Sequence, residues 1–436
     1  MALLAAACAR TTRAMATTSD ALASLAQRKA AFLGTGDATR TVVVGNRAGD
    51  LDSIASALAV AHLTSGVAVA QFARRDLALR RDASKALDFL AAGDALVFAD
   101  ELDADVAERR RVDELWLTDH NCVDASFPLA GAVAGIVDHH ADEGAHASAG
   151  DRDIDAAAGS CSSLVAERLV KAGSASSSLG ALLLFAIVLD CRGFDAKFQG
   201  TKFSPRDVAA AHALLDALGG LEETVARSEG GLRARLLPAT CRLGGATTVA
   251  KLSGILSAAR FDVAGLTSRQ LLALDYKHAT VDGLRVGAAN IFLTMVEFAA
   301  QAGGEAALSD ALRDFAEEEE VDVLFAMTKH DATAGGRALV YYATKGASTL
   351  EAGLAALPRG LSAALLASPL FVEQGVSTSG LGVAAFDDVG DSARACALDE
   401  KTSRKTVLPA ILHLLGARGP VLDIPRPRAR TDISVA

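Results

Sequence analysis

The sequence predicts an α/β protein: a mainly parallel sheet flanked by helices in its N-terminal part, then a smaller α/β domain. Short apolar segments rich in β-branched residues alternate with helical segments, and this order implies right-handed crossovers between parallel strands. Polar clusters directly follow several of the apolar segments, and ligands bind beyond the carboxyl ends of parallel strands. The 436 residues allow two or three domains at roughly 150 residues each.

Composition narrows the class of protein. Apolar residues make up 51% and charged residues 22%, which excludes wholesale disorder and fits a soluble enzyme or binding protein. The longest apolar run, 179–189, is shorter than the ~20 residues of a membrane helix, so no membrane association is expected. With 43 basic and 53 acidic residues, no nucleic-acid partner is expected either. Six scattered cysteines indicate free thiols in a reducing, cytoplasmic compartment.

The N-terminal part begins with a strand, a loop and a helix. The run 41–44 is β-branched and ends on Gly45, and apolar positions then recur at helical spacing over 51–63. Further strands are expected at 67–72, 115–117 and 133–137, and further helices at 85–90, 161–169, 179–190 and 205–218. Pro205 suits the first turn of the last of these helices, and the 179–190 helix is apolar all round, which predicts a buried helix.

The C-terminal part mixes the two kinds of element. Helices are expected at 268–275 and 308–319, and strands at 284–292, 321–327 and 338–343. The expected domains are a tail or transit peptide at 1–38, a metal-binding domain at 39–225, a linker at 226–255, a substrate-binding domain at 256–418 and a tail at 419–436. The first 19 residues contain Arg10 and Arg13 but no acid, so mitochondrial or plastid targeting is the alternative to a plain disordered tail.

The first polar cluster lies between the first strand and the first helix. Asp50 and Asp52 are two residues apart, so on a loop that enters a helix both carboxylates can face one cavity. Paired carboxylates suit hard cations such as Mg²⁺ or Mn²⁺. The alternative is that they only cap the helix and complement its dipole.

Three further clusters strengthen the metal interpretation. Asp119 follows the strand at 115–117, His139 and His140 follow the strand at 133–137, and Asp190 ends the apolar helix. Consecutive histidines on an extended chain face opposite ways, so one can bind metal while the other reaches a different partner. A buried carboxylate such as Asp190 needs a neighbouring cation. Four such clusters predict a two-metal centre in which a bridging water becomes acidic enough to act as hydroxide.

Three cations could complete the site from the C-terminal part. Arg404 and Lys405 are adjacent just before an apolar segment, and basic residues at a helix start oppose its dipole. A guanidinium fork beside an ammonium point charge suits a phosphoanhydride. Lys277 is the third candidate, and the alternative for all three is a solvated surface.

These motifs resemble the Asp-His-His (DHH) phosphoesterase superfamily, in the branch with a DHH-associated C-terminal (DHHA2) domain. That branch holds eukaryotic exopolyphosphatases, prune-type proteins and class II, manganese-dependent inorganic pyrophosphatases. The resemblance covers about 41–415 and rests on GNRAGDLDS, TDHN, VDHH, the helix ending in Asp190, LTSRQLLALDYK and SRKTVLP. It implies an active site in the cleft between the two domains.

The resemblance also implies roles for individual residues. One divalent metal would be bound by Asn46, Asp50, Asp119 and Asp190, and the other by Asp52, Asp119, His139 and Asp190. His140, Lys277, Arg404 and Lys405 would bind phosphate oxygens, and Asp119, His140, Arg404 and Lys405 would carry the catalysis.

Two departures from the family pattern refine the expected activity. Class II pyrophosphatases carry His where this chain has Asn46, which favours an exopolyphosphatase and leaves Mg²⁺ and Mn²⁺ equally suited. Cys191 follows Asp190 where the family usually has Thr. The expected reaction is release of orthophosphate from the end of inorganic polyphosphate. The alternatives are a pyrophosphatase, a prune-like short-chain polyphosphatase or cyclic-nucleotide phosphodiesterase, and a non-catalytic scaffold.

Overall fold

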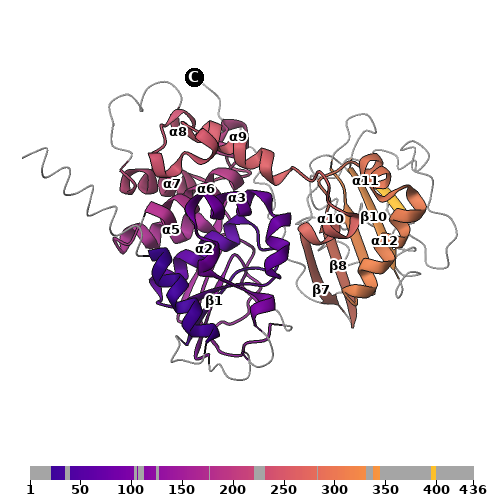
Figure 1. The fold of residues 1–436 in the computed structure, drawn as a ribbon, viewed down its shortest axis with the longest axis horizontal. Coiled ribbons are helices and arrows are strands. Elements are labelled where there is room, and N and C mark those ends of the chain that lie inside the picture. The colour runs from indigo at the N-terminus through magenta and orange to yellow at the C-terminus, as the bar shows by residue number, and fades with distance from the viewer. Residues whose placement is uncertain are drawn as a thin grey trace, which may run out of the picture. The chain divides into compact units, whose positions relative to one another are not determined.

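The computed structural model describes residues 21–34, 40–102, 106, 112–123, 127–175, 177–219, 231–281, 283–329, 337–343 and 394–398. The chain divides into two compact units, residues 1–262 and 263–436, and each has its own sheet (Figure 1). The expected α/β class, with a parallel sheet first and a smaller second domain, is confirmed. In the described part of the chain, no helix is both long and apolar enough to cross a membrane.

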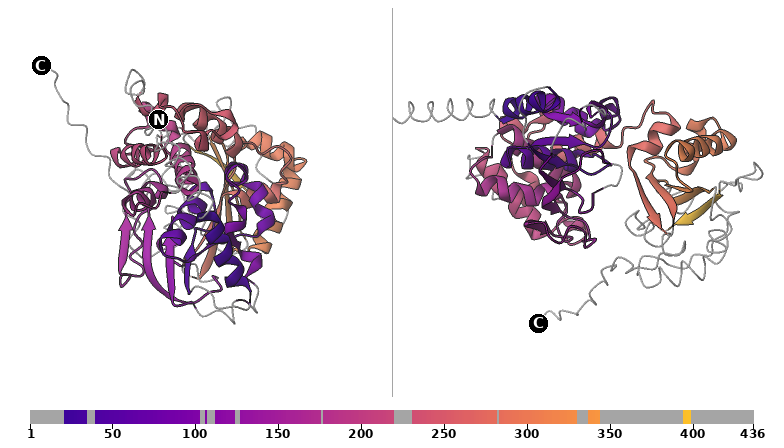
Figure 2. Two further views of the ribbon diagram at one scale, coloured as in Figure 1. Left: turned by 60° about the vertical axis from the view of Figure 1, so that its left-hand side comes forward. Right: turned by 90° about the horizontal axis from the view of Figure 1, so that it is seen from below.

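The sheet of the first unit has six strands that are all parallel, in the order β3-β2-β1-β4-β5-β6 (Figure 2). The strands are β1 (Thr41–Val44), β2 (Val67–Ala70), β3 (Leu96–Phe98), β4 (Glu114–Thr118), β5 (Ala132–Asp138) and β6 (Asp151–Ile154). From β1 the chain first adds strands on one side and then, at β4, on the other. The strand order therefore reverses between β1 and β4, and ligands bind beyond the carboxyl ends of strands at such a point.

Helices cover the sheet and bury its apolar side chains. They are α2 (Leu51–Leu63), α3 (Arg81–Leu90), α5 (Cys161–Lys171), α6 (Ser177–Asp190), α7 (Pro205–Ala217), α8 (Gly231–Ala234) and α9 (Val249–Arg260). The apolar side chains of α6 are buried on every side, as its uniform apolarity predicted. Asp207 and Ser204 form a capping box at the start of α7, and Pro205 takes the first position.

The N-terminal tail expected over 1–38 is wrong for residues 21–33, which form a helix. Leu25 is buried with the helices on one face of the sheet, and Phe32 is buried with the strands on the other face. Nζ of Lys29 donates to the carbonyl oxygen of Leu96, in edge strand β3, and to Glu101, at 2.7 and 2.8 Å. Three anchors thus fasten this helix to the sheet edge.

The linker expected over 226–255 differs from the structure, because the division between units falls after Asp262. Leu237, Leu252 and Leu256 are buried in the same core as α6. Weak periodicity in this stretch predicted a junction between domains. In the structure, single apolar side chains from its short turns and from α9 pack into the core of the first unit. α9 also ends on Arg260, which reaches the polar clusters described below.

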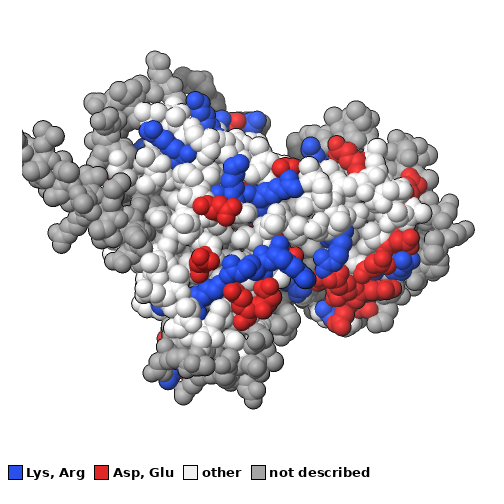
Figure 3. Space-filling model, in the orientation of Figure 1, with Lys and Arg blue, Asp and Glu red and all other residues white. Residues whose placement is uncertain are grey.

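The second unit has a five-stranded sheet in the order β11-β10-β9-β8-β7, in which only β8 and β9 are parallel. The strands are β7 (Tyr276–Val281), β8 (Leu284–Asn290), β9 (Val323–Met327), β10 (Arg337–Ala343) and β11 (Arg394–Leu398), and the helices are α10 (Ser268–Leu274), α11 (Met295–Ala302) and α12 (Glu305–Glu318). Acidic side chains gather on the face of this unit that Figure 3 shows. Helix α12 carries Asp310, Asp314 and Glu317.

Candidate metal centre

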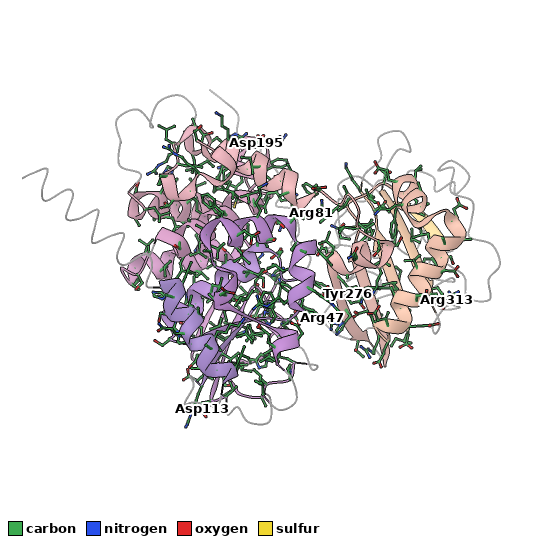
Figure 4. The ribbon with its side chains drawn as sticks, viewed as in Figure 1. Arg47, Arg81, Asp113, Asp195, Tyr276 and Arg313 are labelled. Carbon is green, nitrogen blue, oxygen red and sulfur yellow. The ribbon has the colours of Figure 1, made fainter. Side chains whose placement is uncertain are left out.

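Three of the predicted polar clusters follow neighbouring strands at one edge of the parallel sheet. Asn46 comes two residues after β1, Asp119 directly follows β4, and His139 directly follows β5. The loop after β1 is tight: the backbone N–H of Asn46 donates to Oγ of Ser53 at 2.6 Å. A Cβ at Gly45 would lie 2.6 Å from that same oxygen, so only glycine fits there. Arg47, labelled in Figure 4, belongs to this loop.

Asp119 lies at the middle of the cluster. Its side chain is 2% exposed, and its φ of 63° places a non-glycine residue in the left-handed region. A strained backbone of this kind is typical of functional sites. Here a hydrogen bond from the N–H of Asp119 to the carbonyl oxygen of Val137 stabilises it. Oδ1 of Asp119 lies 3.2 Å from Nε2 of His139, yet it is among the buried oxygens of the described residues that accept no well-formed hydrogen bond.

The orientation of His139 suits a metal ligand. Its Nδ1 lies 3.2 Å from the carbonyl oxygen of Ala158, which can only accept, so Nδ1 carries the proton of the neutral ring. Nε2 then directs its lone pair at Oδ1 of Asp119, 3.2 Å away, and at Oδ2 of Asp52, 3.8 Å away. A divalent cation among these three atoms, or a proton on Nε2, would offset the negative charge of the two carboxylates.

His140 and Asp138 form a supporting pair beside these groups. Asp138 is fully buried and accepts from Nδ1 of His140 at 2.8 Å and from Nδ2 of Asn121 at 2.6 Å. Burial alone would raise the pKa of Asp138, but the hydrogen bonds from His140 and Asn121 outweigh it and hold that pKa below its usual range. Nδ1 of His140 also lies 3.6 Å from Oδ1 of Asp119. Among the described residues, Asp119, His139 and His140 form a group that could hold a metal ion.

Asp52 has a structural as well as an electrostatic place. Its carboxylate accepts from Oγ of Ser160 at 2.7 Å and from the backbone N–H groups of Cys161 and Ser162 at 2.8 Å. It therefore caps the N-terminus of α5, where the helix dipole favours a negative charge. The capping role predicted for the helix at 51–63 falls to Asp50, whose side chain accepts from the N–H of Ser53 at the start of α2. Asp52 instead caps α5, and its Oδ2 also faces His139.

The amide of Asn46 is directed differently from a metal ligand. Its Nδ2 donates to Oδ2 of Asp119 at 2.5 Å, and its Oδ1 accepts from the N–H of Gly49 at 2.9 Å. The opposite amide orientation would set oxygen against oxygen at Asp119. In this structure Asn46 holds Asp119 in place and does not direct its oxygen into the cluster, unlike the ligand role that the resemblance implied.

Asp50 and Asp190 meet at a cation that the sequence analysis missed. Nη1 of Arg260 donates to Oδ1 of Asp190 at 2.7 Å and Nη2 to Oδ2 of Asp50 at 3.3 Å. Nε of Arg260 lies 3.1 Å from Oδ2 of Asp82 in the first turn of α3. The sequence does not identify Asp82 and Arg260 as site residues, because the stretches around them have mixed charge or weak periodicity.

The carboxylates share one electrostatic environment. Burial raises the pKa of Asp190 to about 6, with further contributions from Asp52 and Asp50 and opposition from Arg260. Burial and the charge of Asp52 raise the pKa of Asp119 well above its usual range, and Asp50 adds to this. The charges of Asp50 and Asp52 act on both Asp119 and Asp190, and this excess of negative charge favours divalent cations.

The predicted phosphate-binding cations belong to the second unit. Lys277 lies in β7, where it pairs in register with Ala288 of β8. Arg404 and Lys405 lie outside the described residues, so their predicted roles stay predictions. The expected cleft between the domains likewise stays a prediction.

Comparisons with known proteins agree with the resemblance found in the sequence. Residues 255–414 match the DHHA2 domain. Exopolyphosphatase PRUNE1 from Bos taurus is 30% identical over 300 residues, and the human protein of the same name is 30% identical over 299 residues. Each match covers 66% of this chain and 59% of the relative, so the chain spans less than two thirds of the relatives' length.

A solved structure has the same fold. The chain matches a Methanococcus jannaschii protein assigned to the family II inorganic pyrophosphatases, with a TM-score of 0.53, 16% identity, and coverage of 86% of this chain and 99% of the other. At this identity the match shows the fold alone. The DHHA2 match and these relatives agree with the resemblance found in the sequence.

Proposed function

We propose that this relative of the prune-type exopolyphosphatases hydrolyses the terminal phosphoanhydride bond of inorganic polyphosphate and releases orthophosphate. The observation that carries the proposal is the arrangement around Asp119. A buried, strained carboxylate faces the lone pair of His139 and the carboxylate of Asp52, at the point where the strand order of a parallel sheet reverses. Such a site suits divalent cations and a ligand of high negative charge.

In this proposal Asp119, His139, Asp52, Asp50 and Asp190 hold two divalent ions, Mg²⁺ or Mn²⁺. Bound ions of this kind acidify a water molecule and neutralise phosphate charge. Hydrolysis joins the oxygen of water to the terminal phosphorus and breaks the bond from that phosphorus to the bridging oxygen.

Other side chains act on the substrate or on the ligands. Asn46 holds Asp119 through Nδ2, and Asp138 fixes the ring of His140 through Nδ1. The orientation that Asp138 imposes lets His140 bind a phosphate oxygen near Asp119. Lys277, Arg404 and Lys405 bind further phosphate oxygens.

A dedicated pyrophosphatase is the second candidate, because the fold matches one assigned to that class. Asn46 favours the longer substrate, because the resemblance gives class II pyrophosphatases a His at this position. The amide of Asn46 is neutral and is engaged with Asp119 and Gly49. A substrate panel separates the two candidates. Orthophosphate release is measured from pyrophosphate, tripolyphosphate, long polyphosphate and a cyclic nucleotide, with Mg²⁺ and with Mn²⁺.

We expect metal-dependent release of orthophosphate that is faster from tripolyphosphate or longer chains than from pyrophosphate. Faster release from pyrophosphate would favour the second candidate. Absence of release from every substrate with either metal would refute an enzymatic role and leave the scaffold alternative.

A further inference from the structure

One buried carboxylate outside the candidate metal centre is bound from several directions. Asp207 lies in the first turn of α7 and is fully buried. Both of its oxygens accept from the backbone N–H of Gly159, at 3.0 and 2.9 Å. Oδ1 also accepts from the hydroxyl of Ser163 in α5 at 2.6 Å, and Oδ2 accepts from the N–H and the hydroxyl of Ser204, both at 2.8 Å. The contacts with Ser204 cap α7, whereas those with Gly159 and Ser163 do not serve that helix.

The contact with Gly159 continues to His139. The N–H of Gly159 belongs to the same peptide group as the carbonyl of Ala158, and that carbonyl oxygen lies 3.2 Å from Nδ1 of His139. One planar peptide group therefore joins the carboxylate of Asp207 to the imidazole. A peptide that donates its N–H to a carboxylate has a more negative carbonyl oxygen, because consecutive hydrogen bonds polarise one another. Asp207 thus makes Ala158 a stronger acceptor for the Nδ1 proton.

The chain at Gly159 is closely confined. A Cβ there would lie 2.2 Å from the carbonyl oxygen of Lys202 and 3.0 Å from Sγ of Cys191, so only glycine fits. Cys191, which stands where the family usually has Thr, therefore lies against this segment. The confinement holds the N–H of Gly159 on the two oxygens of Asp207.

The same short segment supports a second predicted ligand. Ser160 donates its hydroxyl to Asp52 at 2.7 Å, and Oδ2 of Asp52 lies 3.8 Å from Nε2 of His139. The resemblance places Asp52 and His139 at the same metal position. An anchor on the segment 158–160 therefore acts on two ligands of one ion.

We propose that Asp207 is a positioning residue of the metal centre: through the peptide group between Ala158 and Gly159 it fixes the ring of His139 and directs Nε2 at the metal. This inference rests on the metal centre of the proposed function. Metal-bound histidines commonly donate their other ring N–H to a carboxylate or a backbone carbonyl, which orients the ring and makes the ligating nitrogen more basic. Here both acceptors act in series, with the carbonyl between the imidazole and the carboxylate.

The test is Mn²⁺ binding to the full chain carrying Asp207→Asn, which keeps the size of the side chain and removes its charge. Dissociation constants are measured by isothermal titration calorimetry and by the electron paramagnetic resonance signal of free Mn²⁺. Loss of an outer partner of a metal-bound histidine weakens metal binding by about 10- to 100-fold, so the Mn²⁺ affinity should fall about 10-fold or more. Turnover should recover when the Mn²⁺ concentration is raised by the same factor, with little change in KM for tripolyphosphate.

A spectroscopic signature separates this role from a general loss of stability. The chain is labelled with ¹⁵N-histidine and loaded with Mg²⁺, and the Nδ1–H proton of His139 is observed by nuclear magnetic resonance. This proton should resonate further upfield in Asp207→Asn, because a weaker acceptor deshields it less. The resonance is identified by its absence in His139→Gln.

Two variants control for stability and for the chemical change. Ser204→Ala removes the capping hydroxyl and should lower the urea midpoint, but it leaves both contacts between Asp207 and Gly159 in place. Glu297→Gln is the matched change from acid to amide. Glu297 holds the same position in the capping box of α11, where it accepts from the N–H of Thr294 at 2.8 Å. In both variants the Mn²⁺ affinity and the histidine resonance should stay as in the unmodified chain.

A measurement on the unmodified chain covers the case in which Asp207→Asn does not fold. A cation at Nε2 of His139 makes Nδ1–H a stronger donor, and the polarisation should reach the N–H of Gly159. The amide resonance of Gly159 should therefore move downfield when Mg²⁺ is added. The N–H of Ser204 donates to the same carboxylate without belonging to that peptide group, so its resonance should move less.

Unchanged Mn²⁺ affinity in folded Asp207→Asn, an equal loss of affinity in Ser204→Ala, or a Gly159 resonance that Mg²⁺ moves no more than that of Ser204 would overturn the inference and leave Asp207 as a helix cap. Failure of the proposed function gives a different result. A chain whose Mn²⁺ affinity depends on Asp207 but which releases no phosphate keeps the inference and loses the proposed activity. An active chain whose Mn²⁺ affinity does not depend on Asp207 does the reverse.

Discussion

Replacing Asp119 by Asn should make the metal-free protein more stable while it abolishes turnover. The substitution keeps the size of the side chain and removes one buried negative charge. Oδ1 of Asp119 and Oδ2 of Asp52 both lie within 3.8 Å of Nε2 of His139. The two oxygens are therefore no more than about 7 Å apart, and two unit charges at that separation repel each other by about 2 kcal/mol at an effective dielectric constant of about 20.

Part of this gain is offset. Asp119 accepts from Nδ2 of Asn46, and a hydrogen bond to a neutral amide is weaker by about 1 kcal/mol than one to a carboxylate. The free energy of unfolding in EDTA should therefore rise by about 1 kcal/mol. With Mg²⁺ or Mn²⁺ present the order reverses, because the unmodified protein gains binding energy that the variant has lost. Phosphate release should fall by about 10³-fold or more, since the shared ligand is gone.

The assay is urea unfolding with and without metal, together with phosphate release from tripolyphosphate. Asp113→Asn is the matched control. Asp113 lies just before β4, at the opposite end of that strand from Asp119, and pairs with Arg40 at an exposed position, so its loss should leave stability and rate nearly unchanged. Phosphate release close to normal in Asp119→Asn, or a metal-free variant clearly less stable than the unmodified chain, would refute the reasoning.

Three further outcomes follow from the same site. The folded-state pKa of Asp190 is raised to about 6, so its contribution to metal-free stability is present below about pH 4 and is lost as pH rises through 6. In Asp190→Asn the free energy of unfolding should lack this decline of about 3 kcal/mol, and parallel pH profiles of the two proteins would contradict the expectation. Asp52→Asn should destabilise the metal-free protein by about 1 kcal/mol, because three hydrogen bonds weaken by about 1 kcal/mol each while the repulsion from Asp119 of about 2 kcal/mol is lost; a variant clearly more stable than the unmodified chain in urea would argue against the capping role. Arg404→Ala should raise KM and lower kcat for polyphosphate, and steady-state rates equal to those of the unmodified chain at all concentrations would remove Arg404 from the site.

Local signals in the sequence were enough where one element carried its own pattern. The expected bounds of β1 and α2 agree with the structure, because a β-branched run, a glycine and helical spacing follow one another directly. The convergence of Asp119, His139 and Asp52 was expected from parallel strands whose carboxyl ends share an edge. The second unit was expected as α/β, and its mixed sheet agrees.

The features that were missed depend on tertiary contacts. The strand β6 was missed because its sequence is mostly charged and shows no apolar strand pattern. Its acids Asp151 and Asp153 pair with Arg168, a contact that the local sequence does not indicate. Arg260 reaches the centre only because α9 packs against α6 in the first unit. The role of Asn46 depends on the orientation of one amide, which spacing along the chain does not determine.

The helix at 21–33 has a practical consequence for work with shortened proteins. The motifs begin at β1, so a fragment starting near residue 39 looks sufficient from the sequence. Such a fragment would lack Leu25 and Phe32 from its interior, and it would leave β3 without the amine of Lys29 across its outer backbone. An uncovered edge strand pairs readily with another chain, so preparations trimmed to the motifs should aggregate, whereas those that begin before residue 21 should stay dispersed.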